Sequence, residues 1–403
     1  MSSMKYWRYL ALAVGVLALV VALAACGSSS SSSSSEATGS ETTEAEGGKE
    51  ETASAGGSGG IAEAEAAVAE ALKKPTDWKP PGKPINVSGL KGKTAYIIAN
   101  SLSLAFTTTL TENMKEAFTK AGLKVVVVDD KAEVSQTAKL IEQAVSQGAS
   151  VITIQSHASD LISAPLKVAK EAGIPVIEMF EGDPGLPTKQ QEEQGVSALA
   201  TYCYSCAGEL LANWATANSG GEVTGVTYYD SDVGASQAMN EGQKQQFAKV
   251  CPSCEVEYKN VLVADWAKSL PTLTQTDLSN PKLNYFLPNY DGMTTYMVPA
   301  IKAAGAEERV KIGSFNANLP YMEELAKGGV IKADIGSPVA WMGWAVADQG
   351  LRVMNGEPPL ENVDIPFRLF DESNIKEINL KEPESTWYGV NYQQEYEKLW
   401  GLG

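Results

Sequence analysis

The residues of this chain that could do chemistry are few and unevenly placed. Histidine occurs once, at His157, which leaves no set of histidines for a metal site and argues against most catalytic triads. The five cysteines fall at one position near the start and in two Cys-x-x-Cys pairs, at Cys26, Cys203, Cys206, Cys251 and Cys254. A cysteine can anchor a lipid, bind zinc, carry out redox chemistry or form a disulfide, so the surrounding sequence has to decide among these roles.

The first cysteine follows a secretory leader. Lys5 and Arg8 precede the apolar run Leu10–Ala25, and the small residues of Leu-Ala-Ala-Cys end at Cys26. This motif is similar to a bacterial lipobox, which implies a signal peptide over residues 1–25 and lipidation of Cys26. The alternative is a plain signal peptide with an incidental cysteine. Residues 26–60 are rich in Ser, Glu and Gly, which predicts a disordered tether of roughly 30–35 Å by random-coil scaling.

The spacing of the two Cys-x-x-Cys pairs would by itself fit one four-cysteine zinc site. The predicted elements argue against it, because Cys206 begins one helix whereas Cys251 ends a later one. About 20 Å separates those two ends, at about 1.5 Å per helical residue. That distance is too long for one metal ion or for a disulfide between the pairs. Thiols outside the membrane tend to oxidise, so we predict two local disulfides, Cys203–Cys206 and Cys251–Cys254. A redox-active pair at the helix start is the alternative.

Single-histidine chains can still be enzymes, so the surroundings of His157 matter. Ser156 and Asp160 flank it, but triad partners are defined by geometry and no nucleophile-elbow motif is present. We interpret His157 as a loop residue and predict no enzyme, no metal ion and no cofactor. Lys and Arg number 32 against 49 Asp and Glu, a formal net charge of −17. Such a balance repels nucleic acid, so a nucleic-acid partner is not expected.

The body of the chain alternates short β-branched runs with amphipathic segments that end at glycine. The runs predict strands at 94–99, 125–128, 151–154, 175–177, 223–228, 256–260, 283–287, 310–314 and 331–335. Helices are predicted at 61–74, 110–121, 135–147, 161–172, 208–217, 237–250, 293–304, 321–328 and 341–353. Apolar strands between helices indicate parallel sheets. The fold class is therefore α/β, with two doubly wound parallel-sheet lobes and a ligand cleft at the strand carboxyl ends.

The order and spacing of several segments resemble the type I periplasmic-binding-protein family, in its sugar-binding, ribose-binding-protein-like branch. The similarity runs from about residue 93 to 376 and includes AYIIANSLSLAFTTTLTENMKEAFTKAG, AGIPVIEMFEG, YFLPNYDGM, KIGSFNAN and IGSPVAWMGWAVAD. The resemblance implies a hinge of three strands between the lobes. It places lobe one at 93–202 plus 337–366 and lobe two at 203–336 plus 367–403, after a helix and extended approach segment at 61–92.

The resemblance also implies which residues line the cleft. The family's aromatic after the first strand is matched by Phe106, its Asp-Arg by Phe180-Glu181, and a usual arginine by Gln237. These departures replace charged hydroxyl-binding groups with aromatics and amides, which offer stacking faces and orienting hydrogen bonds instead. The expected ligand-binding residues are Phe106, Phe180, Glu181, Tyr202, Gln237, Tyr290, Asn316 and Gly336.

These observations together predict a monomeric, extracytoplasmic solute-binding protein, held at the cell membrane by the lipid on Cys26. It would capture a sugar or polyol by hinge closure and deliver it to the permease subunits of an ABC importer. One alternative is a module that presents its ligand to a membrane sensor, and another is a binder of a less polar, aromatic-type solute. An extracytoplasmic enzyme lacks a motif, and a transcriptional regulator of similar fold would need a DNA-binding helix pair where the leader stands.

Overall fold

The computed structural model of the chain describes residues 55–231 and 233–403, which lie in one compact unit, Thr52–Gly403. The predicted signal peptide, Cys26 and most of the predicted tether lie outside the described residues. Among the helices that are described, none has both the length and the apolar character needed to cross a membrane.

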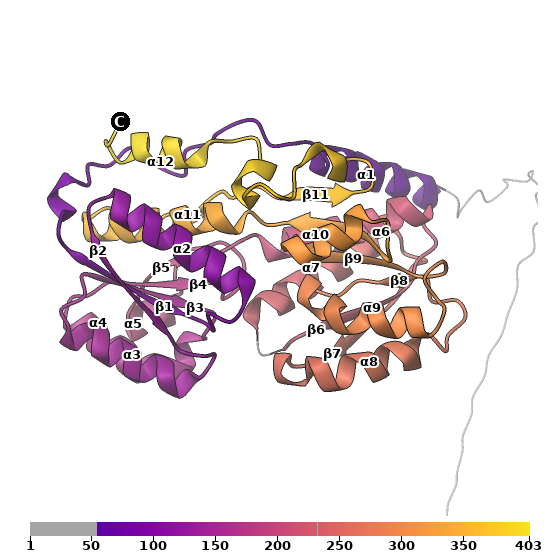
Figure 1. The fold of residues 1–403 in the computed structure, drawn as a ribbon, viewed down its shortest axis with the longest axis horizontal. Helices are drawn as coiled ribbons and strands as arrows, with labels where there is room; N and C mark the ends of the chain where they lie inside the picture. Colours follow the sequence, from indigo (N-terminus) through magenta and orange to yellow (C-terminus); the bar gives the residue numbers. More distant parts are fainter. Residues whose placement is uncertain (1–54, 232) are drawn as a thin grey trace, which may run out of the picture. The chain divides into compact units, whose positions relative to one another are not determined.

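Lobe one is built on a five-stranded parallel sheet with the order β2-β1-β3-β4-β5 (Figure 1). Its strands are β1 (Thr94–Ala99), β2 (Lys124–Asp129), β3 (Val151–Gln155), β4 (Val176–Met179) and β5 (Val196–Ala200). Its helices are α2 (Ala105–Lys120), α3 (Val134–Ser146), α4 (Ser163–Glu171), α5 (Lys189–Gln194) and the later α11 (Val339–Met354), which packs against α2.

Lobe two is built on a six-stranded sheet with the order β11-β10-β9-β8-β6-β7, in which β11 alone pairs antiparallel, to β10. Its strands are β6 (Thr224–Tyr229), β7 (Glu255–Asn260), β8 (Tyr285–Phe286), β9 (Lys311–Asn316), β10 (Ile331–Gly336) and β11 (Arg368–Asp371). Its helices are α6 (Tyr204–Ser219), α7 (Gly234–Val250), α8 (Trp266–Asp277), α9 (Thr294–Ala303) and α10 (Leu319–Ala326).

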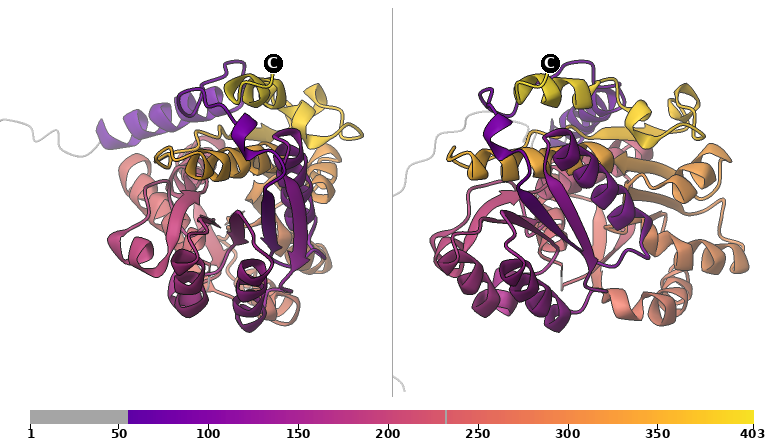
Figure 2. Two further views of the ribbon diagram at one scale, coloured as in Figure 1. Left: turned by 90° about the vertical axis from the view of Figure 1, so that its left-hand side faces the viewer. Right: turned by 60° about the vertical axis from the view of Figure 1, so that its left-hand side comes forward.

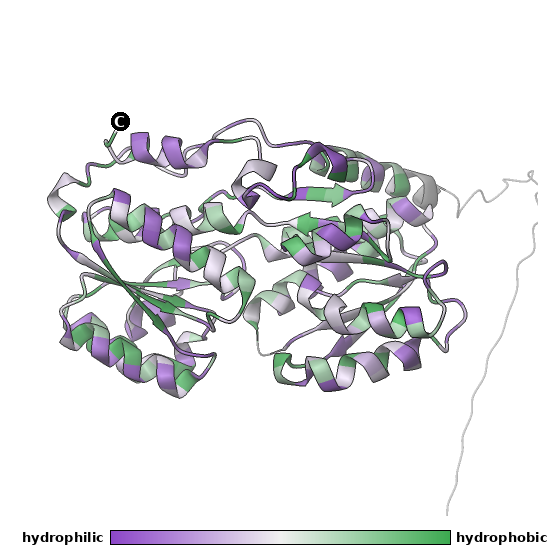
Figure 3. Ribbon diagram, viewed as in Figure 1, coloured by the Kyte–Doolittle hydropathy of each residue, from purple (hydrophilic) through white to green (hydrophobic). Residues whose placement is uncertain are grey.

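The central strands are buried on both faces, as the apolar runs predicted. Every residue of β3 and all but the first of β1 are buried, and Figure 3 shows these strands as hydrophobic bands between helices with polar outer faces. The edge strands β2 and β7 are more exposed. A parallel sheet covered on both sides requires this pattern, and the predicted α/β class with two lobes is confirmed.

The chain passes between the lobes more often than predicted. The three expected crossings are present, at 200–204, 336–339 and 354–368. A fourth comes from α1 (Ala55–Ala71), which packs on α6 and α7 of lobe two before the chain enters β1 of lobe one. A fifth leads to α12 (Tyr392–Leu399), which packs on α11 of lobe one. In Figures 1 and 2, α1, α11 and the C-terminal segment lie on the same side of this unit.

Two predicted boundaries differ from the structure. The segment 367–403 was assigned to lobe two as a whole, but its last helix lies on lobe one because Trp400 stacks on Trp344 of α11, with ring centroids 5.4 Å apart. The tether was predicted to reach Gly60, whereas α1 begins at Ala55. Gly60 lies directly on the α7 backbone, where an added Cβ would come within 2.3 Å of the Val250 carbonyl oxygen. Packing therefore makes a helix of residues whose composition indicates a linker.

A similar close approach joins α6 to α7 and yields a test of the fold. A Cβ on Gly208 would lie 1.9 Å from the Met239 carbonyl oxygen, so Gly208→Ala must push the two helices apart. Overpacking costs about 1–3 kcal/mol, against roughly 1 kcal/mol that alanine gains in helix propensity. We expect a lower denaturant midpoint for Gly208→Ala. Gly89→Ala is the control, because nothing lies within 4 Å of its Cβ position. Equal midpoints for the two variants would contradict this packing.

Candidate functional site

Backbone strain gathers at one edge of each sheet. The described residues other than glycine that have positive φ are Ser101, Lys131, Ala132, Ser156, Phe180, Asn316, Ala317 and Asp364. All of these except Asp364 lie at or just after the carboxyl end of a parallel strand, namely β1, β2, β3, β4 or β9. Such conformations cost about 1–3 kcal/mol each and cluster at functional sites. The strain therefore marks the carboxyl edges of the two sheets as the candidate site.

These two edges meet where the lobes face each other. Glu181 follows β4 in lobe one, and Gly234 is the first residue of α7 in lobe two. A Cβ on Gly234 would lie 3.1 Å from the carbonyl oxygen of Glu181, so the two backbones are in contact. Side chains at the strand ends of both lobes can therefore reach one solute held between them.

A run of aromatic rings crosses this region. Phe106 at the start of α2 meets Phe180 edge-on at 5.5 Å, and Phe180 stacks on Tyr202 at 5.6 Å with an interplanar angle of 12°. Tyr202 in turn contacts Phe315 of β9 at 6.3 Å, which carries the run into lobe two. Phe180 and Tyr202 are buried, whereas Phe106 is half-buried. Of these rings, Phe106 is the one with a face left for a solute.

Lobe one also has a polar network behind these rings. The His157 Nε2 atom lies 2.9 Å from Asp130 Oδ2 and 3.3 Å from Asn100 Nδ2. Asp130 also accepts hydrogen bonds from the Ala132 N–H and from the Thr137 hydroxyl, at 2.8 and 2.9 Å. His157 is buried at the ends of β1 and β3, held by a carboxylate and an amide. This arrangement orients the ring and supports the interpretation of His157 as a loop residue at the binding edge.

Lobe two contributes a second polar group. The Ser236 hydroxyl donates to the Tyr290 oxygen at 3.0 Å, and Tyr290 packs at a tilt beside Trp266, with centroids 6.3 Å apart. The Asp291 carboxylate accepts from the backbone N–H of Asn318 at 2.7 Å and from its side-chain amide at 2.9 Å. Burial raises the pKa of Asp291 to about 7, although these hydrogen bonds lower it. Tyr290 and Trp266 are half-buried and present ring surface from this side.

Two glutamates at the end of β4 lack a cation. Both carboxyl oxygens of Glu178 are buried without a hydrogen-bond partner among the described residues. Burial, followed by the charges of Glu181 and Asp160, raises the pKa of Glu178 to about 8. Burial also raises the pKa of Glu181 to about 7, and the nearby His157 lowers it. Burial therefore disfavours the charged form of both carboxyls at this edge of lobe one.

The predicted ligand residues are placed unevenly. The rings of Phe106, Phe180 and Tyr202 are in contact, and Glu181, Tyr290 and Asn316 each lie at or shortly after the carboxyl end of a strand. Gln237 lies on an exposed part of α7, where its amide donates at 3.5 Å to the Ser231 carbonyl. Gly336 lies under the C-terminal segment, where an added Cβ would be 2.4 Å from the Tyr388 hydroxyl oxygen. The sequence analysis did not identify Asn100 or Trp266 as site residues. Asn100 directly follows the first strand, and that position could have identified it. Trp266 begins a helix that was not predicted.

Two surface cavities lie at the opposite ends of the strands. One has a volume of about 380 Å³ and is lined by residues next to the starts of β1, β3, β4 and β5, including Lys93, Ser150, Pro175 and Val196. The other, of about 580 Å³, lies at the starts of β6 and β7, beside Thr224 and Glu255. Neither carries the strained residues or the ring pairs, so we place the site at the carboxyl edges.

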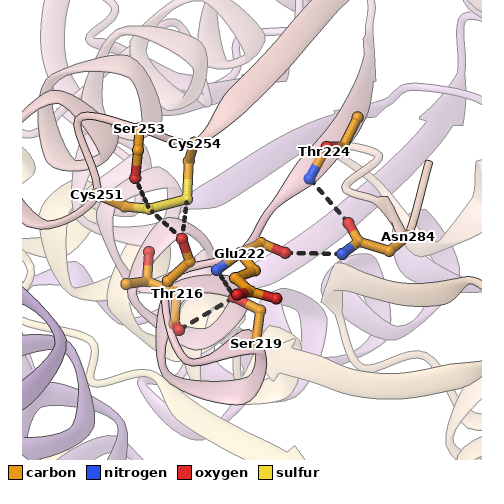
Figure 4. Close-up of a disulfide and its surroundings, with 9 residues drawn as sticks. Thr216, Ser219, Glu222, Thr224, Cys251, Ser253, Cys254 and Asn284 are labelled. Carbon is orange, nitrogen blue, oxygen red and sulfur yellow. Dashed lines mark hydrogen bonds between the residues drawn. A yellow bond between two sulfur atoms is a disulfide. The ribbon is translucent and has the colours of Figure 1, made fainter. Parts of the chain in front are cut away.

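The four body cysteines pair locally. The Cα atoms of Cys203 and Cys206 are 5.2 Å apart and those of Cys251 and Cys254 are 5.4 Å apart, with the sulfur atoms of each pair at bonding distance. Figure 4 shows the disulfide between Cys251 and Cys254. The Gly221 carbonyl oxygen lies 3.2 Å from the Cys251 sulfur. Over the part of the chain that the structure describes, no group of three or more His, Cys, Asp or Glu side chains could hold a metal ion.

Comparisons with known proteins identify the family of the fold. The model of a family described as the periplasmic binding protein domain matches residues 95–358. The ribose import binding protein RbsB of Bacillus subtilis (strain 168) is 20% identical over 297 residues, which cover 73% of this chain and 92% of that protein. RbsB of Escherichia coli (strain K12) is 21% identical over 71% of this chain and 93% of its own length. These matches confirm the resemblance seen in the sequence.

A solved structure shows the same fold. The periplasmic solute-binding protein of an ABC transporter from Actinobacillus succinogenes 130z, crystallised with bound D-allose, has a TM-score of 0.63. The match has 18% identity and covers 72% of this chain and 100% of that chain. At this identity the likeness establishes the fold, and the residues that differ at the strand ends decide the ligand.

The buried Glu178 predicts a pH dependence of stability. Its pKa rises from 4.5 to about 8 on folding, so between these values the folded chain keeps a proton that the unfolded chain has released. Stability then falls as pH rises, by up to about 1.4 kcal/mol per unit. We expect Glu178→Gln to flatten this slope in urea unfolding between pH 5 and 8. The exposed Glu171→Gln on α4 is the control and should keep the wild-type slope; an unchanged slope in Glu178→Gln would refute the burial argument.

Proposed function

The chain belongs to the family of periplasmic binding protein domains, and we propose that it is a lipid-anchored, extracytoplasmic binder of a sugar or polyol that serves an ABC importer. Members of this family bind small sugar solutes outside the cytoplasm, work with ABC transporter permeases and are not enzymes. The observation that carries the proposal for this chain is the gathering of strained backbone, half-buried rings and acceptor groups where the two lobes face each other.

The charges at this edge favour a neutral solute. In the described segments that follow the strand carboxyl ends, the one lysine or arginine is Lys131, which is exposed. Glu181 stands there without a hydrogen bond or ion pair to a described residue, and burial, which raises its pKa to about 7, disfavours its charged form. The hydroxyls of a sugar or polyol can donate to such acceptors, while an apolar ring face lies on Phe106 or Tyr290. Closure of the lobes would bury these contacts.

Apolar side chains on both lobes support delivery to a permease. The large exposed hydrophobic residues next to the strand carboxyl ends are Leu102, Leu104, Leu161 and Leu186 in lobe one, and Val263 and Leu319 in lobe two. Of the described large hydrophobics that are exposed, only Val168 and Leu402 lie elsewhere. Such side chains suit a contact with another protein. The distance between the two sets changes when the lobes close. A permease that contacts both sets at once would therefore distinguish closed lobes from open lobes.

A thermal-shift screen of the full chain tests the ligand class. The panel contains sugars, polyols, the matching sugar acids and aromatic acids, and binding raises the apparent melting temperature by mass action. We expect neutral sugars or polyols to raise it and their acid forms to leave it unchanged. A shift with aromatic acids alone would favour the aromatic-type solute and overturn the carbohydrate proposal.

The compound that shifts the melt then tests the site residues. Phe106→Ala and Asn316→Gly should each weaken binding of that compound at least tenfold, because one removes a ring face and the other an amide. Glycine is chosen at position 316 because φ is +117° there, so the backbone is not strained further. Tyr258→Ala, on the edge strand β7, is the control and should bind as wild type. Wild-type affinity in both site variants would place the solute elsewhere.

The proposed anchor has its own test. Cys26→Ser removes the sulfur to which a lipid would attach, while the apolar leader Leu10–Ala25 stays intact. We expect wild-type chain expressed in a bacterial host to sediment with membranes and the variant to appear in the extracytoplasmic soluble fraction. Ser28→Ala is the matched control and should sediment with membranes. Equal partition of wild type and Cys26→Ser would exclude a lipid on that residue.

A further inference from the structure

Two segments outside the matched family region span both lobes. The arm, residues 55–87, precedes the match at 95–358, and the tail, residues 372–403, follows it. The arm begins as α1 on lobe two and ends beside β1 of lobe one. The tail begins after β11 in lobe two and ends as α12 on lobe one. Figures 1 and 2 show both along the side where α11 lies.

In lobe one, a buried arginine holds the arm. Arg352 of α11 donates from NH1 to the Lys83 carbonyl at 2.8 Å and from Nε to Asp348 at 2.7 Å. The other oxygen of Asp348 accepts from the Trp400 indole N–H at 2.8 Å, so one ion pair holds arm and tail together. The arm and the tail also bond directly, through the Ile85 N–H and the Leu399 carbonyl at 2.8 Å.

In lobe two, a second buried arginine binds both the arm and the tail. Arg368 of β11 donates from NH1 to the Trp387 carbonyl in the tail at 2.9 Å, and from Nε to the Leu72 carbonyl in the arm at 3.5 Å. Asn374 donates to the same Leu72 carbonyl at 3.0 Å. Hydrogen bonds from a charged donor are the stronger kind, and a buried arginine that loses such partners is costly. Each lobe therefore has its own attachment for both segments.

The tail also binds the hinge itself. The carboxylate of Glu384 accepts from the backbone N–H groups of Val339 and Ala340, at 3.0 and 3.1 Å. These are the first two residues of α11, directly after the crossing at 336–339. A carboxylate at a helix N-terminus satisfies free N–H groups and complements the helix dipole. A change in hinge angle that moved α11 relative to the tail would have to break this cap.

We propose that the arm and the tail form a brace that restricts how far the lobes open, with Arg352, Arg368 and Glu384 as its positioning residues. For a solute that needs closed lobes, the apparent Kd equals the intrinsic Kd divided by the fraction of molecules whose lobes are closed or nearly closed. The brace raises that fraction before any solute arrives. The consequence for affinity rests on the proposed function, whereas the restriction of opening does not.

The test cuts the arm without changing a packed residue. A recognition site for a sequence-specific protease is inserted between Thr76 and Asp77, which are exposed and lie between the two attachments. Dyes on unnatural amino acids at the exposed Lys139 and Lys268 report the distance between lobes by single-molecule energy transfer. In the full chain without solute, we expect cleavage to broaden the distribution towards longer distances. An unchanged distribution after complete cleavage would overturn the brace.

Two controls separate restriction from damage. The same site between the exposed Glu307 and Glu308 gives a cut chain in which no connection between lobes is severed, and its distribution should not change. If the insertion at 76 prevents folding, the variant Glu384→Ala is tested instead. A cooperative melt shows that this variant folds, and we expect the same broadening of the distance distribution. If the screen yields a ligand, a fall of the compact fraction to one third should weaken its binding about threefold. Failure of every sugar and polyol in the screen would refute the proposed function and leave the distance result standing.

Discussion

Parallel pairing of neighbouring strands brings segments that are distant in the chain to one edge of each sheet. In lobe one, this pairing puts Asn100, His157 and Glu181 at the ends of three adjacent strands, although 81 positions of sequence numbering separate the first from the last. Several residues in the turns after these strands adopt positive φ. The strained residues and the functional groups therefore lie at the same edge of each sheet, and the two edges are in contact through Glu181 and Gly234.

The described arginines bind backbone carbonyls, so they do not neutralise the carboxyl groups at the strand carboxyl ends. The donors to these carbonyls are Arg309 just before β9, Arg352 on α11 and Arg368 in β11. The carboxyls at the edge are left with hydrogen bonds or with no partner, and burial raises the pKa of Glu181 and of Asp291 to about 7. The hydroxyl groups of a neutral solute can donate to or accept from such carboxyls in either protonation state. The chemistry of the ligand is thus constrained partly by what the arginines do elsewhere.

The fold could be predicted from sequence where local signals and burial agree. The run TAYIIA and the glycine after each helix predicted β1 and its neighbours, because strands buried on both faces must be apolar throughout. α5, β5, α8, β11 and α12 were not predicted. α5 is a short Glu/Gln-rich helix, β5 has alternating burial, α8 contains Pro271, and α12 is polar except for the residues that meet α11. Each of these elements depends on contacts with distant residues, which the local sequence does not display.

The candidate site, like the fold, could be predicted from the sequence only in part. The expected ligand residues were all taken from the family pattern, and those at or shortly after the end of a strand, such as Phe180 and Asn316, lie at the carboxyl edge because parallel strands share that edge. Gln237 and Gly336 were chosen by matching a family pattern, and the structure puts one on an exposed helix face and the other under Tyr388 of the tail. Gly336 is the informative case. It lies within the family match, yet it is covered by the tail, which lies outside the match. The tail therefore takes part in shaping the hinge crossing at 336–339, and the ligand affinity of such a protein depends on residues far outside the solute's reach.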